Sequence, residues 1–255
     1  MLSSIITVNL NNCRGLEKTM QSVLNQTFDD FEYIVIDGGS IDGSYNLIKL
    51  NEGKIAKWIS EKDSGIYHAM NKGIEMASGK YCLFLNSGDT LHQPDTLKKI
   101  FRIDQSYDII YGNMMIHYPD GKKRVGLMPK TIDQNQMIND TLWHPVSFIS
   151  RKLFEQYGYY DENYRIAGDY DFFVKVFSKC AINSKHCGII VSDFYAGGLS
   201  YSQTNKQLLE SERNAVQQKY FTPDEITKAK LIAHNRNNFS TRILNKFNQL
   251  LARLA

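Results

Sequence analysis

The chain has 255 residues, 42% of them hydrophobic and 22% charged, and a formal net charge of +3 at pH 7. This size and composition predict a globular protein with one large domain, or a domain plus an appendage. The small net charge and the lack of an arginine-rich run argue against nucleic-acid binding. No run of about 18 apolar residues is present, so we expect no transmembrane helix.

The cysteines and the start of the chain predict a cytoplasmic protein. Cys13, Cys82, Cys180 and Cys187 form no CxxC pair and no zinc spacing, so free thiols in a reducing compartment are expected. Residues 1–8 lack the basic start and long apolar core of a signal peptide and instead resemble a first strand.

The first half of the chain alternates strand and helix patterns. Strands are predicted at 4–8, 31–36, 56–60 and 81–85, the last of them a continuous apolar run. Apolar residues at helical spacing predict helices at 16–24, 44–50 and 66–77 between these strands. This alternation predicts an α/β fold, with a largely parallel sheet and helices on both faces.

The second half of the chain is less regular. Strands are expected at 108–112 and 188–192, and a hairpin joins 114–118 to 124–128 around the turn Pro119-Asp120-Gly121-Lys122. Helices are expected from Pro94 and over 152–157 and 169–178, and Thr222–Glu225 has a capping-box pattern. We therefore divide the chain into a domain at 1–220 and a C-terminal helical extension at 221–255.

Polar residues follow three of the predicted strands, at Asn9, at Asp37–Ser40 and at Asn86–Asp89. Ligands of such sheets bind just beyond the carboxyl ends of the strands. Asp37 is suited to accept from a ribose hydroxyl or a pyrimidine N–H, and Asp89 is a hard oxygen ligand for a divalent ion that holds a phosphate. Turn formation and helix capping explain the same residues as well. A dehydrogenase is disfavoured, because the GxGxxG pattern does not follow the first strand.

Six segments, in order and at matching spacing, resemble family 2 glycosyltransferases of the GT-A fold. They are 34–43 (IVIDGGSIDG), 60–74 (SEKDSGIYHAMNKGI), 84–89 (FLNSGD), 143–145 (WHP), 167–172 (AGDYDF) and 196–200 (AGGLS). The resemblance covers about residues 3–220 and is closest to the small bacterial enzymes that build surface polysaccharides. It implies a mixed, mainly parallel, Rossmann-like sheet with helices on both faces, followed by C-terminal helices.

The same resemblance implies an activity. The chain would be an inverting, metal-dependent hexosyl- or N-acetylhexosaminyltransferase that moves a sugar from a UDP-sugar to a saccharide or lipid-linked saccharide. The QxxRW-like segment that accompanies processive polymerases in the family is missing, so transfer of a single sugar is expected.

The resemblance also implies roles for individual residues. Asp169 would be the general base, and Asp89 the acid that binds Mn²⁺ or Mg²⁺. Asp37 would bind the uracil or ribose, with Asn9 near the same base and Asp63 near the nucleotide and donor sugar. The remaining substrate-binding positions are Gly39, Asn71, Asn86, Asp171 and, on the acceptor side, His144.

Two departures from the family pattern bear on these roles. Asn86 and Gly88 leave Asp89 as the only carboxylate of its turn, so the diphosphate and water would complete the shell of the metal ion. His68 stands where relatives often have an aspartate, and we interpret it as an exposed residue of its helix.

Other interpretations stay open at this stage. Asp169 also suits a helix N-cap, and His144 a partly buried structural histidine. A non-catalytic nucleotide-sugar-binding protein is the main alternative, against which the retention of Asp169 argues. A nucleotidyltransferase would need a basic, glycine-rich phosphate loop, for which residues 9–15 offer only Arg14 and Gly15.

The end of the chain carries an amphipathic basic pattern. Six apolar residues recur at helical spacing with three basic residues between them: Ile243, Leu244, Phe247, Leu250, Leu251 and Leu254, with Arg242, Lys246 and Arg253. This pattern is typical of a helix that lies on an anionic membrane, and residues 240–255 would then contact the inner face of the plasma membrane. A helix that packs on the domain, or on a second subunit in a homodimer, has the same pattern.

Overall fold

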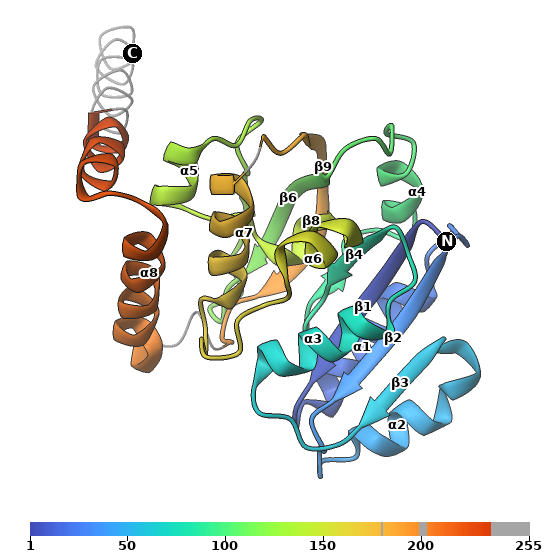
Figure 1. Cartoon of the computed structure of the whole chain (residues 1–255). Coiled ribbons are helices and arrows are strands. Elements are labelled where there is room, and N and C mark those ends of the chain that lie inside the picture. The colour runs from blue at the N-terminus through green and yellow to red at the C-terminus, as the bar shows by residue number, and fades with distance from the viewer. Residues whose placement is uncertain (180, 199–202, 236–255) are drawn as a thin grey trace, which may run out of the picture.

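The structure, a computed structural model, describes residues 1–179, 181–198 and 203–235 (Figure 1). Within these residues one nine-stranded sheet has the order β3-β2-β1-β4-β8-β6-β9-β5, with β7 paired to β6. The strands are β1 (Ser3–Asn9), β2 (Phe31–Asp37), β3 (Lys57–Ser60), β4 (Tyr81–Phe84), β5 (Thr90–Leu91), β6 (Ile109–His117), β7 (Lys123–Gly126), β8 (Ser147–Ser150) and β9 (Ser184–Tyr195).

The sheet is mixed and mainly parallel, as predicted. Strands β1 to β4 run in one direction, and β8 joins them to β6 by antiparallel pairing on both of its sides. Strand β9 is parallel to β6, whereas β5 and β7 run against their neighbours. The carboxyl ends of β1, β2 and β4 therefore lie at one edge, which is where a ligand site is expected.

The named helices of the described residues are α1 (Cys13–Leu24), α2 (Ser44–Leu50), α3 (Ile66–Met76), α4 (Thr96–Ile100), α5 (Gln134–Asn139), α6 (Arg151–Tyr157), α7 (Gly168–Lys179) and α8 (Lys206–Tyr220). Helix α3 packs on β1 and β2, and α1 packs on β1 from the other side, together with α2 (Figure 1). This division is the result of right-handed crossovers between parallel strands. Helices therefore cover both faces of the sheet.

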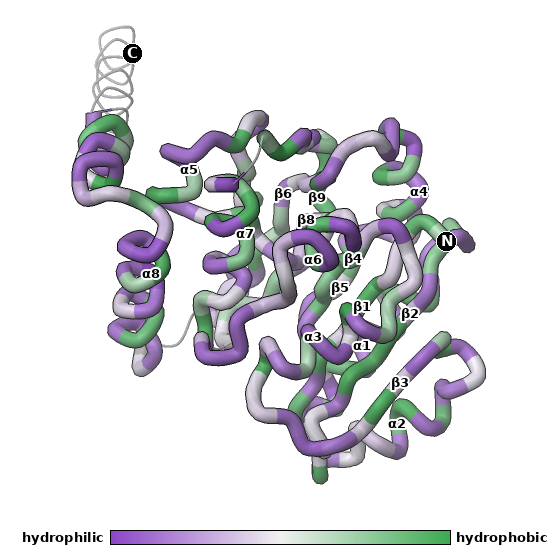
Figure 2. The backbone as a smooth tube through the Cα atoms, in the orientation of Figure 1, coloured by the Kyte–Doolittle hydropathy of each residue, from purple (hydrophilic) through white to green (hydrophobic). Residues whose placement is uncertain are grey.

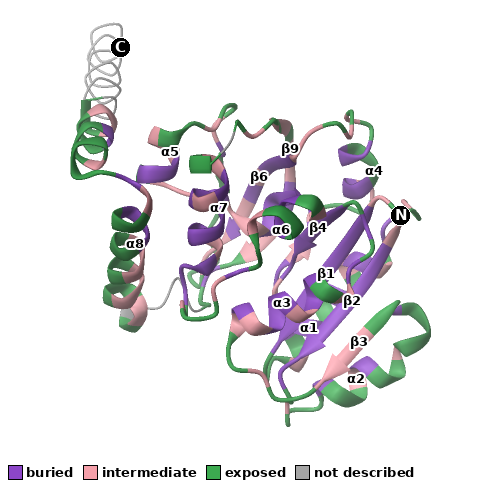
Figure 3. Ribbon diagram, in the orientation of Figure 1, coloured by how far each residue is buried: buried purple, intermediate pink, exposed green. Residues whose placement is uncertain are grey.

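The packing explains why these segments are strands and helices. Strand β1 is buried along its whole length, and β2 is buried from Glu32 onwards. Figures 2 and 3 show this as hydrophobic, buried central strands and as helices whose outer faces are polar and exposed. An aromatic cluster joins α3, β4, α6 and α7; its members are Tyr67, Phe84, Phe154, Tyr160 and Phe172.

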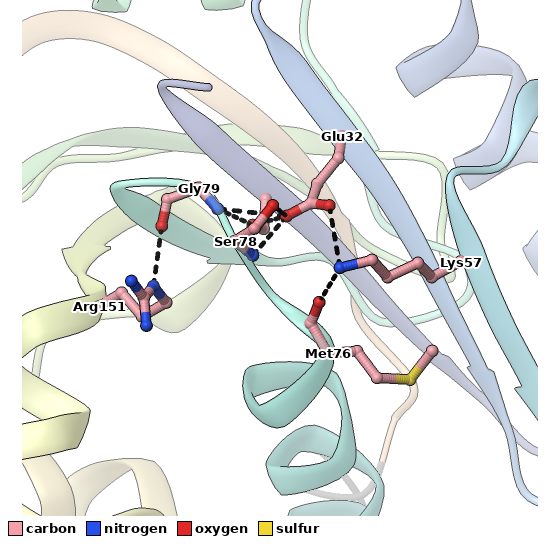
Figure 4. A network of polar contacts seen from close by, with 7 residues as sticks. Glu32, Lys57, Met76, Ser78, Gly79 and Arg151 are labelled. Carbon is pink, nitrogen blue, oxygen red and sulfur yellow. Dashed lines mark hydrogen bonds and ion pairs between the residues drawn. The ribbon is translucent and has the colours of Figure 1, made fainter.

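A buried carboxylate binds the other end of the parallel strands together (Figure 4). Glu32 Oε1 accepts hydrogen bonds from the hydroxyl of Ser4 (2.6 Å) and from the N–H (2.6 Å) and hydroxyl (2.8 Å) of Ser78. The N–H of Gly79 donates to the same oxygen, and the Lys57 ammonium lies 3.6 Å from Oε2. Burial raises the pKa of Glu32, but the hydrogen bonds together lower it by more than burial raises it. The net pKa therefore lies below its usual value. This network fixes the connection from α3 to β4.

Several predicted elements differ from the observed ones. The strands expected at 108–112 and 114–118 form the single strand β6, since Gly112 and Asn113 lie within it at an irregularity in the register with β9. Strand β9 is longer than predicted. The elements β5, β8, α5 and α8 were not predicted, because three of them are very short and α8 lacks a regular apolar stripe.

The C-terminal part packs on the domain as far as it is described. Residues 223–235 are helical, and Glu225 closes the predicted capping box by accepting from the N–H and hydroxyl of Thr222 (both 2.8 Å). The side chain of Asn139 in α5 donates to the backbone of Ala229. The amphipathic pattern at 240–255 lies outside the described residues. None of the helices described has the length and apolar content needed to cross a membrane.

Candidate functional site

Three of the predicted site segments meet at the carboxyl edge of the sheet. Asn9 and Asp37 are paired across β1 and β2. The N–H of Ser87 donates to the carbonyl of Val8 (3.0 Å), which places the turn Asn86–Asp89 beside the end of β1. The three segments that were interpreted as strand ends therefore lie next to one another at this edge of the sheet.

Asp37 is completely buried and is bound by four donors. Oδ1 accepts from Asn9 Nδ2 (2.7 Å) and from the hydroxyl of Ser40 (2.6 Å). Oδ2 accepts from the N–H of Ser40 (3.0 Å) and the hydroxyl of Ser60 (2.6 Å). Burial raises the pKa of Asp37, and these hydrogen bonds lower it more, so the pKa lies below its usual value. Asp37 is thus an ionised anchor that joins the ends of β1, β2 and β3.

The loops after β1 and β2 are linked to each other. The N–H of Asn11 donates to the hydroxyl of Ser40 (2.8 Å), and Asn11 Oδ1 accepts from the N–H of Ile41 (2.9 Å). Gly39 has φ of +79° and lies against the backbone of Lys62. Leu10 and Ile41 expose their apolar side chains at this point. The result is a fixed polar framework with an exposed apolar surface, suited to a planar base.

Asp63 is part of the same corner. Its Oδ2 lies so close to Gly38 that a Cβ on that residue would come within 2.4 Å. Its Oδ1 accepts from the N–H of Gly65 (3.0 Å), directly before α3. Asn9, Asp37, Gly39 and Asp63, which were predicted to bind the donor, are therefore brought together.

Asp89 is a buried carboxylate that lacks the partners needed for its charge. Its residue is 5% exposed, and Oδ2 has no hydrogen-bond partner. Burial raises the pKa of Asp89 to about 7, against the opposing effects of His144 and of the Tyr195 N–H. Gly88, at φ +114°, forms the turn in a conformation that L side chains rarely adopt. Asp89 does not cap a helix, since α4 begins only at Thr96.

His144 connects this turn to Asp169. Its Nδ1 lies 3.0 Å from Asp169 Oδ2, and its Nε2 lies 3.2 Å from Asn86 Nδ2. Because a carboxylate only accepts, the contact with Asp169 requires a proton on Nδ1 of His144. The Oδ1 of Asn86 is buried without a partner. The turn Asn86–Asp89, His144 and Asp169 therefore form one hydrogen-bonded chain.

Asp169 is held from its other side by Tyr67. The Tyr67 hydroxyl lies 3.2 Å from Asp169 Oδ1, which also accepts from the N–H of Tyr170 (2.8 Å). Asp169 lies in the first turn of α7, which begins at Gly168, and is therefore not the N-cap. Burial and the charge of Asp169 raise the pKa of Tyr67 well above its usual value, so the phenol stays protonated.

Asn71 and Asp171 bind protein groups in the structure. Asn71 is buried and bonds the backbone of Tyr160 from both ends of its amide (3.0 and 3.1 Å), as well as Glu162. Asp171 is 1% exposed and accepts from Lys219 (2.9 Å). Neither residue joins the chain of contacts from Asn86 to Asp169, and their binding of substrate stays a prediction.

Some residues of the site were not singled out from the sequence. They are Ser40 and Ser60, which bind Asp37, Thr19, whose hydroxyl donates to the Asp89 carbonyl, and Tyr67. Ser40, Ser60 and Tyr67 lie inside the quoted motif segments, so their spacing was the available signal. His68, on α3, accepts from the N–H of Ser64 (3.0 Å) and does not reach this chain of contacts.

Comparisons with known proteins bear on the family of the chain. The sequence model described as Glycosyl transferase family 2 matches residues 4–158, more than half of the chain. A PGL/p-HBAD biosynthesis glycosyltransferase of Mycobacterium bovis is 29% identical over 81% of this chain and 82% of its own. An uncharacterized glycosyltransferase of Mycobacterium tuberculosis is 32% identical over 69% of each chain.

Solved structures share the fold. Staphylococcus aureus TarS 1-349 in complex with UDP-GlcNAc superposes with a TM-score of 0.62 and 17% identity, over 78% of this chain and 59% of that one. The Pyrobaculum calidifontis mannosyltransferase PcManGT, in complex with GDP-Man and Mn²⁺, gives a TM-score of 0.59 and 14% identity over 78% and 58%. The predicted GT-A fold is confirmed, and the chain belongs to glycosyl transferase family 2 and is an enzyme of the glycosyltransferase class.

Proposed function

We propose that the chain transfers one sugar from a UDP-sugar to a hydroxyl of a saccharide or lipid-linked saccharide, with a divalent metal ion and with inversion at the anomeric carbon. The observation that carries the proposal is the chain of contacts from Asn86 through His144 to Asp169, next to the unpartnered Oδ2 of Asp89. In this chain the turn that contains the unpartnered carboxylate oxygen of Asp89 contacts His144, and His144 contacts the carboxylate of Asp169. A single in-line displacement needs both kinds of group.

The donor nucleotide would bind at the ends of β1 and β2. Asn9 Oδ1 is buried without a hydrogen-bond partner and can accept the N–H of a pyrimidine. Asp37, which is saturated by protein donors, would act mainly by fixing Asn9 and Ser40. The neighbours are described with UDP-GlcNAc and with GDP-Man. We propose a uridine nucleotide for this chain, because the single unpartnered oxygen of Asn9 suits the single ring N–H of uracil.

The residues present fit a divalent ion. Asp89 Oδ2 and Asn86 Oδ1 are buried oxygen atoms without partners, and hard oxygen ligands suit Mg²⁺ and Mn²⁺. Within the described part of the chain no three His, Cys, Asp or Glu side chains are placed to hold a metal. The diphosphate and water would therefore supply the remaining ligands. Such an ion neutralises the charge that develops on the departing nucleotide.

Asp169 would take the proton of the acceptor hydroxyl. His144 donates to Oδ2 and the N–H of Tyr170 donates to Oδ1, so the carboxylate is fixed in orientation before the acceptor binds. Fixed orientation lowers the entropic part of the barrier. Family membership argues against a nucleotidyltransferase, and the oriented base argues against a protein that only binds nucleotide sugars.

A saccharide or lipid-linked saccharide acceptor is part of the proposal. Its support is the M. bovis relative, whose name places it in PGL/p-HBAD biosynthesis. A thermal-shift panel of nucleotide sugars identifies the donor, since a ligand that binds the native state raises its stability.

The decisive experiment measures nucleotide release from the donor identified in that panel, with Mn²⁺, with Mg²⁺ and with a chelator. Asp169→Asn and Asp89→Asn are compared with the wild type and with Asp29→Asn, an exposed control. We expect nucleotide release to be lost in Asp169→Asn and Asp89→Asn and to stay at the wild-type level in the control. Unchanged release in both would refute the assigned roles.

A further inference from the structure

Helix α8 presents a carboxylate to three consecutive backbone N–H groups. Glu212 Oε1 accepts from Arg165 (2.8 Å), and Oε2 accepts from Ile166 and Ala167 (both 2.9 Å). Successive N–H groups that converge in this way form an anion-binding concavity. Hydrogen bonds to an ionised acceptor are about twice as strong as neutral ones. The backbone of 165–167 is therefore held firmly by a residue far along the chain.

The segment that Glu212 holds leads directly into the proposed base. The carbonyl of Ile166 accepts from the hydroxyl of Tyr67 (2.6 Å), the same hydroxyl that lies beside Asp169. Gly168 lies on the ring of Tyr67, where a Cβ would approach to 2.8 Å. Ile166 is thus bound at its N–H by α8 and at its carbonyl by α3, just before the first turn of α7.

Other side chains of α8 hold α7 in place. Lys219 donates to the buried carboxylate of Asp171 (2.9 Å), and Gln217 donates to the hydroxyl of Tyr170 (3.3 Å). The Arg213 guanidinium lies 4.2 Å from the centre of the Tyr170 ring. Glu212 and Lys219 are two helical turns apart and so share one face of α8. This face is polar, and its contacts fix the position of the start of α7 through directed hydrogen bonds.

We propose that Glu212 is a positioning residue for Asp169, and that α8 is a structural part of the acceptor half of the active site. The inference rests on the proposed function, because it takes Asp169 as the base. Glu212 does not approach Asp169 itself. It fixes residues 165–167, and through them the distance of the base from His144 and Tyr67. The family match ends at residue 158, so neither Asp169 nor Glu212 is covered by it.

The test uses Glu212→Gln, which keeps the shape of the side chain and removes the charge. The glutamine side chain has only one acceptor oxygen. Its NH₂ group is a donor, as the backbone N–H groups are, so the two cannot form a hydrogen bond with each other. We expect kcat for sugar transfer to fall by roughly 10- to 100-fold, the scale of a misplacement of the reacting groups. KM for the donor should stay unchanged, since the donor residues lie on other elements. The matched control is Glu210→Gln, an exposed glutamate of the same helix.

A double-mutant cycle separates positioning from general destabilisation. In the Asp169→Asn background, Glu212→Gln should cause no further loss of kcat, because the group that it positions is already gone. Glu212→Asp, which keeps the charge with a shorter reach, should give an intermediate kcat, and circular dichroism should show each variant folded at the assay temperature.

The outcomes distinguish two failures. Two results would overturn the positioning role and leave the proposed function intact. One is a wild-type kcat in Glu212→Gln. The other is an equal factor of decrease in kcat when Glu212→Gln is made in the wild-type and in the Asp169→Asn background. Full activity of Asp169→Asn would overturn the proposed base, and the positioning role with it.

Discussion

The buried carboxylate of Asp89 should make the stability of the metal-free protein depend on pH. Its pKa is raised from 3.8 to about 7, with burial as the largest cause. A raised pKa in the folded state means that the folded state favours the protonated acid. Ionisation therefore costs stability as the pH rises from about 4 to about 7. The cost is roughly 4 kcal/mol above pH 7, at about 1.4 kcal/mol for each tenfold change in proton affinity.

Asp89→Asn removes this cost and keeps the size of the side chain. In the presence of a chelator, the variant should be more stable than the wild type by roughly 4 kcal/mol at pH 8 and by less than half of that at pH 5. Urea unfolding at the two pH values measures both differences. The exposed control Asp29→Asn should show neither.

Addition of a metal ion should reverse the order of stability of the wild type and Asp89→Asn. Mn²⁺ with UDP should stabilise the wild type, since a ligand bound to the native state raises its free energy of unfolding. It should not stabilise Asp89→Asn to the same extent, and sugar transfer by the variant should be lost. If Asp89→Asn is less stable than the wild type at pH 8 without metal, Asp89 has a partner that the structure does not show, and the reasoning is refuted.

Three further predictions concern other parts of the molecule. Asp169→Asn should lower kcat by roughly 10²- to 10⁴-fold, the usual contribution of a general base, while isothermal titration shows unchanged donor binding; weakened binding would place Asp169 at the donor instead. Glu32→Gln should cost roughly 1–3 kcal/mol at pH 7, because it weakens hydrogen bonds to a buried anion. The pKa of Glu32 is lowered from its usual value of 4.5, so this cost should shrink as the pH falls below 4.5 and through the lower pKa of the folded state; a cost that is independent of pH would contradict an ionised Glu32. Lys219→Met should cost roughly 3 kcal/mol in urea unfolding, since it leaves the buried Asp171 charge without its partner, and Lys219→Arg should recover most of it; equal losses would show that packing, and not charge, is responsible.

The sequence predicted the first half of the fold well because its segments have regular apolar patterns. Strands β1 and β2 are rich in Ile and Val and are buried almost throughout, and α2 has the same bounds in prediction and structure. Helix α8 was missed because Glu212, Gln217 and Lys219 bind the domain through polar contacts, so no apolar stripe marks the helix. A short strand such as β8 is defined by its neighbours on both sides, which the local pattern does not contain.

The same limit applies to the site. The strand-end rule predicted that Asn9, Asp37 and Asp89 would meet at one edge. It did not predict that Asp37 would be saturated by protein donors while Asn9 Oδ1 stays unpartnered. Nor did it show that His144 and Asp169 are in contact. Such pairings join residues distant in the chain, so they depend on the completed topology.

The carboxylate of Glu212 also has a consequence for how the enzyme matures. The residues proposed to bind the donor belong to the first half of the chain, and the parallel strands β1 and β2 beside them pack against α1 and α3. The loop before Asp169 receives its anchor only when α8 has left the ribosome. A chain that ends before α8 would lack the anchor of residues 165–167, so the proposed base Asp169 would be oriented only by its contacts with His144 and the Tyr170 N–H.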